Sequence, residues 1–130
     1  MNRRRGVLAI VPALALAAHA VQAAETLVHT QQGYGEAVRS ARPGDTIILA
    51  DGEWRDFEIV FAADGLPNKP ITLTAETKGK VVIAGRSNLR IAGEHLVVSG
   101  LVFRDGHTPT NDVIAFRRTK QHLANHTRVT

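Results

Sequence analysis

Residues 71–100 read ITLTAETKGKVVIAGRSNLRIAGEHLVVSG. Short β-branched or leucine-rich runs follow one another here, separated by Gly, Asn or charged residues, and each run is too short for a buried helix. Similar runs recur along the chain at intervals close to 24 residues, beginning at Ile47, Ile71 and Leu96, and again at Leu89 and Val113. Such self-similarity is typical of repeating units that bury one another's apolar faces. With several strands per repeat and almost no helical pattern between them, the sequence predicts an all-β fold, a parallel β-helix.

One segment before the repeats has helical periodicity. Between Gly33 and Arg42 the apolar residues recur at helical spacing, and Pro43-Gly44 then ends the pattern. The stripe consists of Tyr34, Ala37, Val38 and Ala41. We expect a short N-terminal helix that caps the open end of the solenoid. Trp54 and Phe57 are expected to pack around this cap rather than to form a platform for sugar rings.

The first 23 residues have the organisation of an export signal. A basic stretch, Arg3-Arg4-Arg5, precedes an apolar stretch from Val7 to Ala18, and small residues stand at Val21-Gln22-Ala23. We therefore divide the chain into a signal peptide, 1–23, and one β-helix domain, 24–130. The mature protein is expected to be exported, to the periplasm or the extracellular space, by the Sec or the twin-arginine route. The apolar stretch is shorter than the roughly 20 residues that span a bilayer, so no membrane span is predicted.

Composition excludes several classes of function. The chain has 16 Lys and Arg against 12 Asp and Glu, but three of the arginines belong to the signal, which leaves the mature part near neutrality. We therefore expect no nucleic-acid partner. The chain has no cysteine, which excludes disulfides, thiol nucleophiles and cysteine metal sites.

Several runs together resemble a known enzyme family. They are Gly44-Asp45-Thr46-Ile47-Ile48-Leu49-Ala50-Asp51-Gly52, the stretch from Lys69 to Glu76, the stretch from Gly79 to Ile91, the stretch from Leu96 to Gly106, the stretch from Val113 to Arg118, and the stretch from Leu123 to Thr130. In this combination the chain resembles the N-terminal part of polysaccharide lyase family six, which includes alginate lyases and chondroitinase B.

The resemblance implies a right-handed, pectate-lyase-like β-helix that cleaves an acidic polysaccharide by β-elimination. It also implies a calcium ion, held by Asn and Glu side chains, that neutralises the uronate carboxylate, with a lysine as base and an arginine as acid. Those family residues belong to later turns of the β-helix, beyond Thr130. We therefore assign no catalytic residue and no metal ligand within this chain, and we expect it to be an N-terminal piece of a longer lyase that lacks the catalytic turns.

Candidate substrate contacts come from the basic C-terminal stretch. Arg117, Arg118 and Lys120 are predicted to lie beside the groove and to contact substrate carboxylates, because Arg pairs with them through two parallel hydrogen bonds. We expect His107, His122 and His126 at surface or corner positions, since the spacing of His122 and His126 makes a metal pair only on a helix.

The sequence leaves three functions open. The first is the exported lyase, acting on alginate or on a chondroitin or dermatan sulfate type of polymer; the second is a β-helix that binds an acidic glycan without cleaving it. The third is a structural solenoid of many more repeats. The family-specific stretch from Lys69 to Gly106 favours the lyase.

Overall fold

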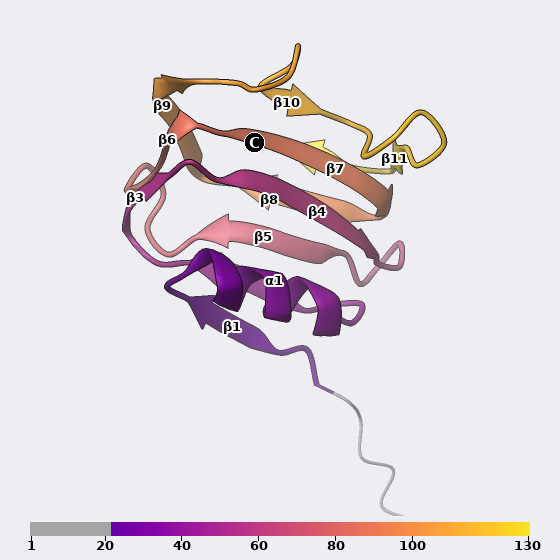
Figure 1. Cartoon of the computed structure of the whole chain (residues 1–130). Coiled ribbons are helices and arrows are strands. Elements are labelled where there is room, and N and C mark those ends of the chain that lie inside the picture. Colours follow the sequence, from indigo (N-terminus) through magenta and orange to yellow (C-terminus); the bar gives the residue numbers. More distant parts are fainter. Residues whose placement is uncertain (1–21) are drawn as a thin grey trace, which may run out of the picture.

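The computed structural model describes residues 22–130, so the predicted signal peptide lies almost wholly outside the described residues. The chain forms three parallel sheets that run along a common stack (Figure 1). The first sheet contains β1 (Glu25–Val28), β2 (Thr46–Leu49), β5 (Ile71–Ala75), β8 (Leu96–Ser99) and β12 (Arg128–Val129). The second contains β3 (Gly52–Arg55), β6 (Val81–Arg86) and β9 (Leu101–His107). In the third, β7 (Asn88–Glu94) pairs with β4 (Glu58–Asp64) on one side and with β10 (Ile114–Ala115) and β11 (Ala124–Asn125) on the other.

Successive turns of the chain stack their strands in parallel in these three sheets, which confirms the predicted parallel β-helix. The recurring runs stack in register, with Thr46 opposite Thr72 and Ile71 opposite Leu96. In β2, β5 and β8, inward side chains alternate with outward ones, as a period of two requires. The inward residues form one continuous core whose largest fully buried members are Phe61, Ile47, Leu49, Ile59, Ile71, Leu73, Ile83, Leu89, Ile91 and Leu96.

The corners of the β-helix use residues with positive φ. Four glycines that punctuate the strands, Gly79, Gly85, Gly93 and Gly100, all have φ in this region. Four non-glycine residues share it: Asp56, His95, Asp105 and His126. For a residue with a Cβ this conformation is uncommon, so these corners are held by their neighbours in the stack.

The predicted cap is present as α1 (Gln31–Ser40), which begins and ends two residues earlier than the sequence indicated. It lies against β1, β2 and β4 at the first turn (Figure 1). Tyr34 is buried, and its hydroxyl donates a hydrogen bond of 2.8 Å to the carbonyl oxygen of Val60. Burial raises the pKa of this phenol.

Trp54 and Phe57 pack beneath the cap, as predicted. Both are buried, and their rings stack with centroids 5.4 Å apart. Phe57 also meets the edge of Tyr34, with centroids 5.3 Å apart, and the indole N–H of Trp54 donates to the carbonyl oxygen of Ala50. Both rings therefore belong to the core beneath the cap.

The start of α1 provides a first prediction. Thr30 is the N-cap, and its Oγ1 accepts a hydrogen bond of 3.0 Å from the backbone N–H of Gly33. Replacing Thr30 by Ala removes that acceptor and is expected to lower the free energy of unfolding by about 1 kcal/mol. Urea unfolding followed by circular dichroism measures the change. Thr30→Ser keeps the acceptor and is the control; equal stability of the two variants would contradict the capping role.

Candidate functional site

A loop carrying several basic residues projects from the third sheet. β10 pairs with β7 at Leu89 and Arg90, whereas β11 pairs with β7 only from Gly93 onward, so residues 116–123 leave the sheet between the two pairings. We call this segment the basic loop. Its base is closed by an antiparallel bridge between Arg117 and Leu123 and by a hydrogen bond of 3.0 Å from the N–H of Ala124 to the carbonyl oxygen of Phe116.

Turn chemistry shapes the tip of the basic loop. Thr119 Oγ1 accepts hydrogen bonds from the backbone N–H groups of Gln121 and His122, and the N–H of Arg118 donates to the carbonyl oxygen of His122. A hydroxyl that accepts from the chain two or three residues ahead is the usual way in which Ser and Thr stabilise tight turns. The loop therefore has a defined shape of its own.

The three predicted substrate contacts all lie on the basic loop. Arg117, Arg118 and Lys120 are exposed. Arg117 has an acidic neighbour, with its Nη2 3.6 Å from Asp112 Oδ2, but both side chains are at least half exposed and such a pair contributes little. The structure thus brings the three cations together beside the third sheet, and their contact with substrate stays a prediction.

Sequence reasoning missed a fourth cation, Arg90. It lies on β7 between Val60 of β4 and Ala115 of β10, on the outward side of the third sheet. Among the described residues its Nε is buried and has no hydrogen-bond partner. An arginine that interrupts the apolar run of β7 was the available signal. The Arg90 guanidinium is a planar donor group of the kind that pairs with carboxylates.

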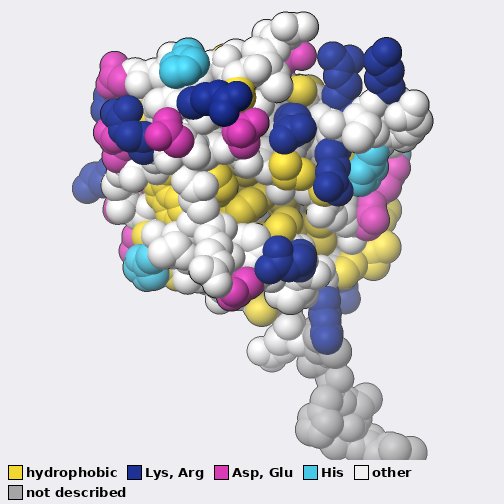
Figure 2. Space-filling view, viewed as in Figure 1, with side chains coloured by type: hydrophobic (Ala, Val, Ile, Leu, Met, Phe, Trp, Pro, Cys, Tyr) yellow, Lys and Arg dark blue, Asp and Glu magenta, His cyan; other side chains and the backbone are white. Residues whose placement is uncertain are grey.

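The basic side chains form part of one face. In Figure 2, Lys and Arg side chains gather on the right of the upper half, over the region where Figure 1 places β10, β11 and the basic loop. A hollow of about 320 Å³ at the foot of the loop is lined by Asp112, Ile114, Ala115, Phe116, Arg117 and Leu123. The face combines positive charge with a shallow recess that has both polar and apolar lining residues.

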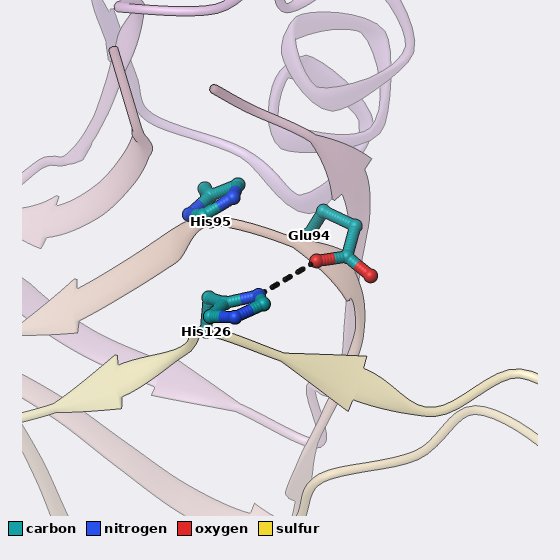
Figure 3. Close-up of side chains that lie close together, drawn as sticks. All are labelled: Glu94, His95 and His126. Atoms are coloured by element: carbon teal, nitrogen blue, oxygen red, sulfur yellow. Dashed lines mark hydrogen bonds and ion pairs between the residues drawn. The ribbon is translucent and has the colours of Figure 1, made fainter. Parts of the chain in front are cut away.

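A second cluster lies where β7 and β11 end (Figure 3). His126 Nδ1 is 3.0 Å from Glu94 Oε2, and the His126 ring stacks on that of His95 with centroids 4.7 Å apart. Asn125 Nδ2 donates a hydrogen bond of 3.0 Å to Glu94 Oε1. The hydrogen bonds from His126 and then from Asn125 lower the pKa of the Glu94 carboxyl.

The histidines are at the surface, as predicted. His107, His122 and His126 are all exposed, and His126 occupies a corner with φ of 50°. The partner of His126 is His95, one turn earlier in the β-helix, and not His122. Sequence reasoning missed Glu94 and His95 because their relation to His126 follows from the stacking register rather than from any short spacing.

The donor atoms of this cluster do not suit calcium. Calcium takes six to eight oxygen ligands, whereas Glu94, His95 and His126 offer one carboxylate and two imidazoles. No other group of three metal-ligating side chains is found among residues 22–130. The prediction that the calcium site lies outside this chain is untested.

Comparison with known proteins identifies the family. The sequence profile described as chondroitinase B matches residues 28–130. The chain belongs to this family. A solved structure described as the PL6 family alginate lyase AlyGC is 62% identical over 82% of this chain, with a TM-score of 0.81. A mannuronic acid specific family 6 lyase from human gut microbiota is 31% identical over 82% of the chain, with a TM-score of 0.73.

Other comparisons agree with this assignment. A PL6 family polysaccharide lyase from Pseudopedobacter saltans is 41% identical over 62% of the chain, with a TM-score of 0.61. No curated protein matches the chain. The predicted resemblance to polysaccharide lyase family six is therefore confirmed. The chain spans 15% of the length of AlyGC and 25% of that of the gut enzyme.

No helix in the described part of the chain is long and apolar enough to cross a membrane.

Proposed function

We propose that this chain functions as part of an exported polysaccharide lyase that cleaves a uronate-containing polymer by β-elimination. The observation that carries the proposal is the 62% identity with the alginate lyase AlyGC over 82% of the chain. Export is supported by the basic, apolar and small-residue regions of the first 23 residues.

Alginate is the substrate class that we favour. Two of the relatives are described as an alginate lyase and a mannuronic acid specific lyase. The family itself is named for a chondroitinase, so chondroitin sulfate is the competing substrate. Both polymers carry a carboxylate on each uronate, and both would be attracted by a basic face.

We assign to this chain the binding of substrate rather than the chemistry. Removal of the proton next to a uronate carboxylate needs a base, an acid and a group that stabilises the intermediate. A lysine that acts as base is usually held by burial or close neighbours, whereas Lys69, Lys78, Lys80 and Lys120 are all exposed. The exposed cations of the basic loop instead present donors that match carboxylates.

A chimera tests the proposal. Residues 28–130 would replace the matching segment of AlyGC, and release of unsaturated uronates would be followed by ultraviolet absorbance. We expect the chimera to cleave alginate in preference to chondroitin sulfate. We expect the 130-residue chain alone to release no unsaturated uronate from either polymer, with or without calcium.

The outcomes separate the three functions. A folded chimera that binds alginate without cleaving it would indicate a glycan-binding β-helix, and one that neither binds nor cleaves would indicate a structural solenoid. Activity of the 130-residue chain that is lost on replacing Lys120, Arg117 or His107 would place catalytic groups within it and contradict our assignment.

A further inference from the structure

We propose that Glu94, His95 and His126 bind a divalent transition-metal ion of the zinc class, which joins two successive turns of the β-helix. The site is distinct from the basic loop, and it does not depend on the lyase proposal. None of its residues is among the predicted substrate contacts, and none was expected to bind a metal ion.

The backbone brings the three side chains together. Glu94 ends β7 and His95 forms the corner that follows; one turn later, Asn125 ends β11 and His126 forms the equivalent corner. Glu94 and Asn125 are opposite one another in the sheet, and the N–H of His95 donates to the carbonyl oxygen of Asn125. Both corners have φ of 50°, so the two imidazoles leave the backbone in the same way, one above the other. Their proximity is a property of the stack rather than of mobile side chains.

The distances are close to those of a metal site. One potential ligand atom from each residue lies within 4.8 Å of the others. Nδ1 of His126 and Oε2 of Glu94 are 3.0 Å apart, whereas two ligands of a tetrahedral zinc ion, each bonded at about 2.0–2.1 Å, are separated by about 3.3 Å. A small opening of this pair would therefore replace its hydrogen bond with a metal ion. Glu94 and His95 are only partly buried and His126 is exposed, which leaves their side chains room to adjust.

One ring must turn to complete the site. The planes of His95 and His126 are inclined by 14°, and a nitrogen lone pair lies in the plane of its ring. Two nearly parallel rings cannot both direct lone pairs at one ion between them, so metal binding requires rotation of the His95 ring out of the stack (Figure 3). Binding should therefore break the stacking that the structure shows.

The donor set selects the metal. Two imidazoles and one carboxylate suit zinc and its neighbours in the transition series, whereas calcium and magnesium need more oxygen ligands. Three protein ligands leave a fourth position for water or a small anion. Asn125 holds the second carboxylate oxygen of Glu94, as outer partners of metal ligands commonly do. Asp64, opposite Glu94 in the sheet, adds negative charge nearby.

Equilibrium dialysis of the untagged chain against zinc tests the site, and it remains valid if the protein self-associates. We expect one ion per chain at micromolar zinc. His95→Gln and His126→Gln should each weaken binding at least 10-fold, and Asn125→Ala should weaken it about 10-fold through the outer contact. His107→Gln is the matched control, because His107 is an exposed histidine on β9 of a different sheet, and it should bind zinc as the unaltered chain does.

X-ray absorption at the zinc edge provides a readout that stability changes would not mimic. We expect a first shell of two imidazole nitrogens and oxygen ligands, reduced to one imidazole in His126→Gln. Less than half an ion per chain at about 10 µM zinc, or equal loss of binding in His107→Gln, would overturn the proposal.

Discussion

Replacing Gly93 by alanine is expected to destabilise the β-helix by more than about 4 kcal/mol, a large part of the 5–15 kcal/mol that stabilises a typical domain. Gly93 lies in the middle of the third sheet with φ of 113°, between Ala63 of one turn and Ala124 of the next. A Cβ added there would overlap the carbonyl oxygen of Ala63. Since that carbonyl belongs to the backbone of a packed strand, the clash can be relieved only by separating two turns.

Gly52→Ala is the matched control for this effect. Gly52 has φ of 128°, but a Cβ added there would meet nothing within 4 Å. It should therefore show the backbone strain alone, about 1–3 kcal/mol. Chemical unfolding followed by circular dichroism, together with the soluble yield, compares the two variants. If both lose the same stability, the close approach of the two turns at Gly93 does not limit the fold.

The first sheet was predictable because its strands are regular. The strands β2, β5 and β8 begin at or one residue before the predicted positions Ile47, Ile71 and Leu96. As expected, a glycine with positive φ follows each of these strands: Gly52, Gly79 and Gly100. The spacing of the runs did not predict the register between strands correctly. Ile47 lies opposite Leu73, whereas the 24-residue interval would place it opposite Ile71. Turns of a β-helix differ in the length of their corner loops, so the same sheet position does not recur at one fixed interval.

The candidate sites depend on the irregular parts. The basic loop was found as a run of cations, but the sequence did not show that it leaves the sheet between β10 and β11. Glu94 and His126 are 32 residues apart, a separation longer than the recurrence of the apolar runs. The i, i+4 spacing of His122 and His126 gave no indication that His126 stacks on His95. The periodicity of the sequence predicts which residues face the core. The sites are formed by outward side chains, and which of these become neighbours depends on how the strands of successive turns are paired.

Reversing the charge of the basic loop should have the largest effect on substrate binding. In the triple variant Arg117→Glu, Arg118→Glu, Lys120→Glu, three attractions to uronate carboxylates are lost and three repulsions gained. At about 0.5 kcal/mol for each exposed interaction, the total approaches 3 kcal/mol, which corresponds to about 100-fold weaker binding of alginate at low salt. Calorimetric titration with alginate oligosaccharides at several salt concentrations measures this, and the difference should shrink as salt rises.

The control for this prediction is a second triple reversal, Lys78→Glu, Lys80→Glu, Arg104→Glu. These cations are exposed as well, but they lie before β6 and on β9, away from the third sheet. Both variants change the net charge equally, so general attraction between a polyanion and the protein would weaken binding by the same factor in each. Binding that depends on the basic loop should weaken about 100-fold in the first variant and less than about 10-fold in the second. Equal losses would mean that the loop has no special part in binding, because only the total charge would matter.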